Sequence, residues 1–414
     1  MELNLRKDAE IIIDEAIRRV LPDEAVKQAL KDKEFNKNGK LYLAAVGKAA
    51  WQMTKTAAEL LGGRLEAGIC ITKYQHVRGE IPRITCYEAG HPVSDENSFR
   101  GTQAVLDLVG NLTEKDTVLF LLSGGGSALF EKPLISAEEL QDITNQLLAC
   151  GADIVEINTI RKRLSEVKGG RFAKICEPAK VYSIVLSDIL GNPLDMIASG
   201  PAYPDSSTCE QALGIIEKYH LKLSPLALEM IEKEPPKTLT NAETVITGSV
   251  KNLCAAAFHA CQELGYETMI LTDQLTCEAK EAGGFLAAIA RSRQNTEKSL
   301  AFIAGGETVV HVKGTGKGGR NQELALAAAA GIAGLKDTAI FSVGSDGTDG
   351  PTDAAGGYCD GRTKEELENA GVDIYQSLCD NNAYDALKRA GGLIFTGATG
   401  TNVNDVAVLL IKRG

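Results

Sequence analysis

The chain has 414 residues, of which 44% are hydrophobic and 24% charged, a composition typical of a globular protein large enough for two domains. Its net charge of −11 argues against a nucleic-acid-binding protein, because such proteins need a basic face. No apolar run reaches the roughly 18 residues that a membrane-spanning helix requires, and the N-terminus lacks a signal-peptide core. We therefore expect a cytoplasmic protein without membrane or nucleic-acid partners.

The N-terminal half alternates predicted strands with predicted helices. An amphipathic helix at 7–30, broken near Pro22, comes first. Strands are expected at 41–46, 67–72, 84–87, 117–122 and 181–186, and helices at 51–61, 98–110, 137–150 and 157–164. Strict alternation of this kind is typical of a doubly wound, mostly parallel, Rossmann-like sheet.

A short polar stretch with two prolines at 232–240 predicts the domain boundary. We place an N-terminal α/β domain at 1–236 and a second α/β domain at 237–414. In the second, strands are expected at 244–247, 267–271, 300–304, 308–312, 338–343 and 406–410, and helices at 252–263, 277–291, 321–333 and 383–390.

The ten cysteines stand singly, without a C-x-x-C pair and without metal-ligand spacing to the five histidines. Scattered cysteines in apolar segments are typical of buried free thiols in a reducing compartment. We expect neither a disulfide framework nor a zinc site.

A glycine loop follows the buried strand at 117–122, with the sequence Ser123, Gly124, Gly125, Gly126 and Ser127. A strand, a glycine loop and a helix start together favour an anion, because free N–H groups and the helix dipole point at it. A tight turn without a ligand has the same sequence signature. Since the chain has no Walker A motif, a phosphate in this loop would need cations from elsewhere.

Other charged residues also stand at predicted strand ends. Lys48 lies after the first strand, where a lysine can reach a phosphate or simply face solvent. Asp188 and Glu307 each follow a strand, so either can accept a proton, hold Mg²⁺ or form an ordinary turn. Five cations crowd residues 158–171, which is typical of a solvated helix face but also fits one or two cations facing an anionic ligand.

Gly314, Gly316 and Gly319 match the spacing of the dinucleotide fingerprint. The acidic residue that this fingerprint expects, Asp337, precedes its strand instead of ending it, which disfavours a nicotinamide site. We interpret residues 313–320 as a cationic loop suited to phosphate or carboxylate. Two further loops rich in turn-forming residues, 345–357 and 397–405, either line a cleft or organise backbone turns.

Taken together, these stretches resemble the class II glycerate kinases, which form 2-phosphoglycerate and carry a MOFRL-type C-terminal domain. Nine segments match in the family's order and span nearly the whole chain. They are 45–49, 89–92, 122–129, 157–162, 186–188, 197–201, 319–325, 348–356 and 399–405.

The resemblance implies transfer of phosphate from ATP to D-glycerate with Mg²⁺, in a cleft between two domains. It assigns phosphate neutralisation to Lys48, phosphate binding to the glycine loop, and proton acceptance or Mg²⁺ binding to Asp188. Glu307 becomes a second metal candidate, and the substrate-binding residues are Arg161, Arg320 and Asn321. A homodimer is left open.

The chain departs from the family at Ser94, where proline is usual, and near Asn192, where acidic residues are usual. The second departure lies just after Asp188 and weakens the case for metal binding there. Two alternatives remain: an NAD(P)H-dependent hydroxypyruvate reductase using the loop at Gly314, and a non-catalytic nucleotide- or metabolite-binding protein.

Overall fold

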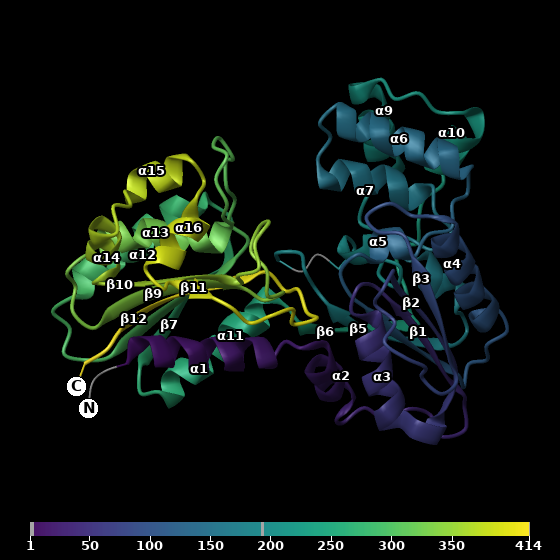
Figure 1. The fold of residues 1–414 in the computed structure, drawn as a ribbon. Helices are drawn as coiled ribbons and strands as arrows, with labels where there is room; N and C mark the ends of the chain where they lie inside the picture. The colour runs from purple at the N-terminus through teal and green to yellow at the C-terminus, as the bar shows by residue number, and fades with distance from the viewer. Residues whose placement is uncertain (1–3, 192–193, 414) are drawn as a thin grey trace. The chain divides into compact units, whose positions relative to one another are not determined.

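The structure, a computed structural model, describes residues 4–191 and 194–413 (Figure 1). They form two compact units. We call residues 25–247 the parallel-sheet unit, and the described residues up to Glu24 together with those from Gly248 the mixed-sheet unit. No helix in the described ranges is long and apolar enough to cross a membrane.

The parallel-sheet unit contains a six-stranded sheet in the order β3-β2-β1-β4-β5-β6. The strands from β1 to β5 pair in parallel, which confirms the doubly wound prediction. The strands are β1 (Leu41–Val46), β2 (Leu65–Lys73), β3 (Ile84–Ala89), β4 (Thr117–Leu122), β5 (Lys180–Leu186) and β6 (Ala242–Gly248). Central β4 is buried along its whole length, as expected for a strand covered on both faces.

Helices cover both faces of this sheet. One apolar cluster packs α2 and α3 against it, and a second packs α4, α5 and α8 against the other face. The remaining helices, α6, α7, α9 and α10, share a separate core and form a helical layer in Figure 1. The helical segments are α2 (Pro22–Leu30), α3 (Ala50–Leu61), η1 (Gly62–Arg64), α4 (Glu96–Val109), α5 (Gly126–Leu129), α6 (Ala137–Ala149), α7 (Ile154–Arg163), α8 (Arg171–Ile175), η2 (Ile197–Ser199), α9 (Cys209–Tyr219) and α10 (Pro225–Ile231).

The mixed-sheet unit has a six-stranded sheet in the order β11-β10-β9-β12-β8-β7. Strand β12 runs antiparallel to both of its neighbours, β8 and β9, while β7 and β8 are parallel. Its strands are β7 (Glu267–Leu275), β8 (Leu300–Gly306), β9 (Thr338–Gly344), β10 (Gly356–Asp360), β11 (Leu393–Ile394) and β12 (Asp405–Ile411). Its helices are α1 (Leu5–Arg18), α11 (Val250–Glu263), α12 (Ala279–Arg293), α13 (Arg320–Gly331), α14 (Thr363–Asn369), α15 (Ile374–Cys379) and α16 (Ala383–Arg389).

The structure divides the chain differently from the boundary that the sequence suggests. Strand β6 lies beside β5 at the edge of the parallel sheet, so the parallel-sheet unit continues to Thr247 instead of ending at 236. Helix α1 packs with α11 in the mixed-sheet unit, because its apolar face needs a covering surface. Asp8 of α1 accepts hydrogen bonds from the Tyr266 hydroxyl at 2.6 Å and the Lys412 ammonium at 2.9 Å.

Two local predictions in the second half differ from the structure. The strand expected at 308–312 is only an isolated bridge between Val309 and Glu278. The loop expected at 345–357 runs into a strand that we did not predict, β10, paired with β9. Its two leading glycines give β10 little strand propensity of its own.

Candidate active site

Three of the predicted site segments end strands of the parallel sheet. Lys48 follows β1, the glycine loop (residues 123–127) follows β4, and Asp188 follows β5. In the observed strand order, the direction of winding reverses between β1 and β4. Ligands of doubly wound sheets bind outside the carboxyl ends of the strands at this reversal. Lys48 and the glycine loop therefore occupy the ligand position that the fold provides.

The loops after β1 and β4 are locked together by short backbone contacts. The Lys48 N–H donates to the Gly124 carbonyl at 2.9 Å, and the Ala49 N–H donates to Ser123 Oγ at 3.1 Å. Gly47 has a φ of 125°, and a β-carbon there would lie 2.2 Å from Ser123 Oγ. Only glycine fits this position. The backbone that carries Lys48 is thus fixed against the glycine loop.

Two side chains of opposite charge converge over Gly124. A β-carbon at this glycine would lie 2.3 Å from Asp188 Oδ2 and 3.5 Å from Lys48 Cε. Three strands, β1, β4 and β5, thus bring a cation, a glycine loop and a carboxylate to one point. Lys48 and the glycine loop can together bind an anion. The Asp188 carboxylate beside them can accept a proton or bind a cation.

His91 also belongs to this group, although the sequence suggested no role for it. A β-carbon on Gly125 would lie 2.9 Å from His91 Cδ2 and 3.3 Å from Lys48 Cγ. Burial, followed by the positive charges of Lys48 and Lys73, lowers the pKa of His91. The imidazole is therefore neutral near pH 7. Two signals could have singled it out: its position just after β3 and its place in the family-matching segment 89–92.

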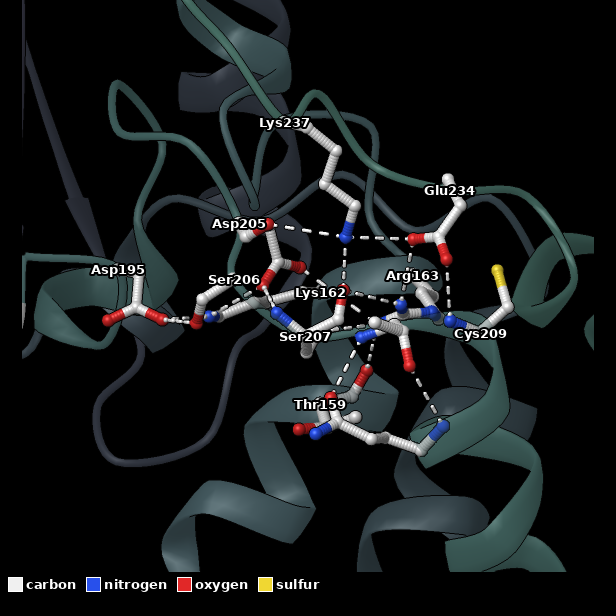
Figure 2. Close-up of polar contacts among 12 residues, drawn as sticks. Thr159, Lys162, Arg163, Asp195, Asp205, Ser206, Ser207, Cys209, Glu234 and Lys237 are labelled. Atoms are coloured by element: carbon white, nitrogen blue, oxygen red, sulfur yellow. Dashed lines mark hydrogen bonds and ion pairs between the residues drawn. The ribbon is translucent and has the colours of Figure 1, made fainter.

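Most cations of segment 158–171 bind the protein itself. Figure 2 shows Lys162 with Asp205 and Asp195, at 3.3 and 3.4 Å, and Arg163 with Ser207 Oγ at 2.7 Å and Glu234 at 3.3 Å. These ion pairs are structural. Lys168 and Arg171 likewise donate to main-chain carbonyls of the unit.

Arg161 differs from its neighbours. Its side chain makes no ion pair or hydrogen bond within the described structure, whereas Arg163, whose Nε is also without a partner, bonds through its other nitrogens. A buried donor without a partner calls for a ligand or another group to satisfy it. Burial lowers the pKa of Lys168, and the Arg161 charge contributes to this shift, so Arg161 lies within electrostatic range of the lysine that binds the Ser127 carbonyl. It therefore stays a candidate for an anionic substrate group.

Arg320, at the start of α13 in the mixed-sheet unit, is held by two carboxylates. Its Nε and Nη2 donate to Asp405 at 2.5 and 3.1 Å, and its Nη1 donates to Glu307 at 2.9 Å. Burial raises the pKa of Asp405 to about 6, partly offset by Arg320. Burial also disfavours the Arg320 charge, but the hydrogen bond to Asp405 and the nearby carboxylate charges together outweigh burial and raise the pKa of Arg320. Asp405 is a partner that the sequence did not identify.

Asn321 is only 2% exposed and bonds to the protein interior. Its amide donates to Asp349 at 3.3 Å and its carbonyl accepts from the Ser342 hydroxyl at 2.5 Å. Asp349 also caps α13, accepting from the N–H groups of Asn321 at 3.1 Å and Gln322 at 2.9 Å. This carboxylate takes the helix-start position where a dinucleotide fingerprint would place its pyrophosphate.

The N–H groups of the loop around Gly314 also donate hydrogen bonds to side chains of the same unit. Those of Lys313 and Gly314 donate to Asn381 Oδ1 at 2.8 and 3.0 Å, and that of Thr315 donates to Asp380 at 2.9 Å. Our interpretation of residues 313–320 as a loop for phosphate or carboxylate stays a prediction, but the chain's own side chains already accept the hydrogen bonds of these three N–H groups. The same geometry removes the basis of the nicotinamide alternative.

The two metal candidates differ in their surroundings. Within the described ranges, no three His, Cys, Asp or Glu side chains gather in a way that could hold a metal ion. Asp188, beside Lys48 and the glycine loop, fits the way Mg²⁺ is held by one or two carboxylates together with substrate phosphates. Glu307 is paired with Arg320. Asn192, the second departure from the family pattern, lies outside the described residues.

Comparison with known proteins adds family, sequence and structural matches. The model described as "Domain of unknown function (DUF4147)" matches residues 8–232, and the MOFRL family matches 300–405. D-glycerate 2-kinase of Thermotoga maritima is 52% identical over 99% of both chains, and glycerate 2-kinase of Pyrococcus horikoshii is 39% identical over 100% of this chain and 99% of its own. The crystal structure of the Thermotoga maritima glycerate kinase superimposes with a TM-score of 0.95, at 52% identity and 99% coverage of both chains.

Proposed function

The chain belongs to the glycerate kinase family, and from this premise we propose how its residues carry out the reaction, the ATP-dependent phosphorylation of D-glycerate at the 2-hydroxyl. The products are 2-phosphoglycerate and ADP. One observation carries the assignment of the site: Lys48 and Asp188 converge on Gly124 where the winding of the parallel sheet reverses.

Phosphoryl transfer asks a protein mainly to position the reactants and to neutralise charge. Lys48 would neutralise the transferring phosphate oxygens as a point charge. The backbone N–H groups of the glycine loop would bind phosphate, since the first N–H groups of a helix have no partner within it. The neutral His91 would offer a hydrogen bond at Gly125 without adding positive charge.

Asp188 has two proposed roles that its position supports equally. It would accept the proton of the glycerate 2-hydroxyl, or it would hold Mg²⁺ together with phosphate oxygens. When bound, Mg²⁺ supplies additional charge neutralisation at the phosphates. Glu307 remains a second metal candidate only after its ion pair with Arg320 opens.

Arg161 is the proposed ligand of the glycerate carboxylate, because its buried Nε has no partner in the described structure and a guanidinium binds carboxylates in bidentate fashion. Arg320 is a second proposed ligand. A substrate carboxylate would replace Glu307, whose side chain is 48% exposed, more readily than Asp405, at 9%. We propose an indirect role for Asn321, which holds Asp349 and the start of the helix that carries Arg320.

The test is to incubate the protein with ATP, Mg²⁺ and D-glycerate and to identify the product by phosphorus NMR. We expect 2-phosphoglycerate with an equal amount of ADP, and no reaction with L-glycerate. Formation of 3-phosphoglycerate would move the transfer to the other hydroxyl. Hydroxypyruvate with NADH serves as a parallel reaction, in which we expect no loss of NADH absorbance.

A cytoplasmic location is part of this proposal. All ten cysteines are free thiols, which supports a reducing compartment.

A further inference from the structure

Ser127, the last residue of the glycine loop, is fastened at two points. Its hydroxyl lies 3.0 Å from the Ser199 hydroxyl, and its carbonyl accepts a hydrogen bond from Lys168 at 2.9 Å. Lys168 is fully buried and paired with the equally buried Glu131. Both the hydroxyl and the carbonyl of Ser127 are therefore hydrogen-bonded to buried residues, Ser199 and Lys168.

The segment that presents Ser199 has an unusual backbone. Ala198, Ser199 and Gly200 have φ values of 49°, 62° and 62°, so all three are left-handed. For Ala and Ser this conformation costs free energy and persists only where the surroundings impose it. A β-carbon on Gly126 would lie 2.6 Å from Ala198 Cβ, so the segment also packs tightly against the glycine loop.

Helix α7 holds this segment with two residues one turn apart. Asn158 Oδ1 accepts a hydrogen bond from the Ser199 hydroxyl at 3.2 Å. Lys162, which stands on the same helix face, bonds Asp195 before the left-handed turn and Asp205 after it (Figure 2). Asn158 thus fixes the hydroxyl and Lys162 fixes both ends of the segment that carries it.

The direction of these hydrogen bonds determines what Ser127 can offer a ligand. A hydroxyl has one proton to donate, and Ser199 gives its proton to Asn158. Ser199 must therefore accept the proton of Ser127. The Ser127 proton points away from the loop, and a phosphate there meets backbone N–H groups instead of this hydroxyl.

We propose that Ser199 is a positioning residue for the glycine loop, acting through the Ser127 hydroxyl, which fastens the loop and does not bind phosphate directly. The inference rests on the proposed function, which gives the loop its phosphate ligand. It predicts that removing either hydroxyl has the same effect, because both changes break the same hydrogen bond.

The experiment compares Ser199→Ala, Ser199→Gly, Ser127→Ala and the double variant Ser127→Ala/Ser199→Ala. We expect each to weaken ATP binding, measured by calorimetry without glycerate, by about five- to tenfold, the range of one hydrogen bond. The double variant should lose no more than either single one. The control is Ser292→Ala, whose exposed hydroxyl donates to the Ile289 carbonyl on α12, and it should bind ATP normally.

Thermal unfolding separates positioning from stability. Ser199→Gly relieves the left-handed strain, so its Tm should equal or exceed that of Ser199→Ala while its ATP affinity is equally reduced. Wild-type ATP affinity in Ser199→Gly, or losses that multiply in the double variant, would overturn the proposal. If the unchanged chain neither binds ATP nor forms ADP, the proposed function fails and the inference falls with it. If it does both, the variants decide the inference alone.

Discussion

Gly124 passes so close to Asp188 that a β-carbon on the glycine would lie 2.3 Å from the carboxylate Oδ2. The obstacle is the end of a side chain, which can rotate, so Gly124→Ala should leave the protein folded and displace Asp188. Because displacements near 1 Å can cost on the order of 100-fold in rate, we expect kcat to fall by about that factor. Steady-state kinetics with D-glycerate checks this. Gly63→Ala, where the added carbon meets nothing within 4 Å, is the matched control and should behave as wild type.

Lys48→Ala should lower kcat by about 100-fold or more with the fold intact, because it removes the charge next to the glycine loop. Lys55→Ala, which removes an exposed lysine of α3, is the control for the loss of a lysine. Circular dichroism and kcat are the measurements. Near-normal turnover of the Lys48 variant would exclude Lys48 from the mechanism.

Asp188→Asn should cause a similar fall in kcat. A Mg²⁺ titration then separates the two proposed roles. If Asp188 accepts the hydroxyl proton, activity stays low at every Mg²⁺ concentration, whereas a metal ligand would show activity restored by more Mg²⁺. Asp107→Asn, on α4, is the control. Full activity of Asp188→Asn at ordinary Mg²⁺ would contradict both roles.

Arg161→Gln should raise KM for D-glycerate by about tenfold, the loss expected for one charged hydrogen bond, with a smaller change in KM for ATP. The reason is that the buried Nε of Arg161 has no hydrogen-bond partner in the described structure and a guanidinium suits a carboxylate. Initial rates measured while the concentrations of ATP and D-glycerate are both varied give the two KM values. Arg100→Gln, at an exposed site on α4, should change neither, and an unchanged glycerate KM in Arg161→Gln would rule this role out.

The Asp405 carboxyl should make stability depend on pH. Burial raises its pKa from 3.8 to about 6 in the folded state, so between these values the folded chain holds a proton that the unfolded chain has lost. Stability therefore falls as pH rises through this window. Relative to Asp405→Asn, the wild type should lose up to about 3 kcal/mol between pH ~4 and ~7. Urea unfolding of both proteins across this range measures the difference, and parallel curves would contradict it.

The sequence was sufficient to predict those parts of the fold and candidate site that depend on local patterns. Buried strands and the residues that follow them placed Lys48, the glycine loop and Asp188 correctly at strand ends. Pairing between distant segments could not be predicted in this way. Nothing in residues 1–24 indicates that α1 would pack against α11, or that Asp405 would bind Arg320 across 85 positions of sequence.

The predicted cations show the same limit in physical terms. The number of charges in segment 158–171 does not show which of them form ion pairs with carboxylates. That depends on how the distant residues 195–207 and 234 pack against this segment. In the structure, Lys162 and Arg163 form ion pairs with those segments, whereas the Arg161 side chain, with its buried Nε, forms none in the described residues. Likewise, a glycine spacing at 314–319 cannot reveal that Asp380 and Asn381 accept hydrogen bonds from the loop's N–H groups, or that Asp349 does so at the helix start that follows.

The membership of α1 in the mixed-sheet unit affects how the chain folds during synthesis. Its first helix leaves the ribosome with an apolar face formed by Ile12, Ile13 and Ala16, but its covering surfaces, α11 and β9, are made hundreds of residues later. The parallel-sheet unit, residues 25–247, is complete in the meantime and can fold as a unit. The nascent protein therefore carries a helix with an uncovered apolar face until α11 and β9 are made.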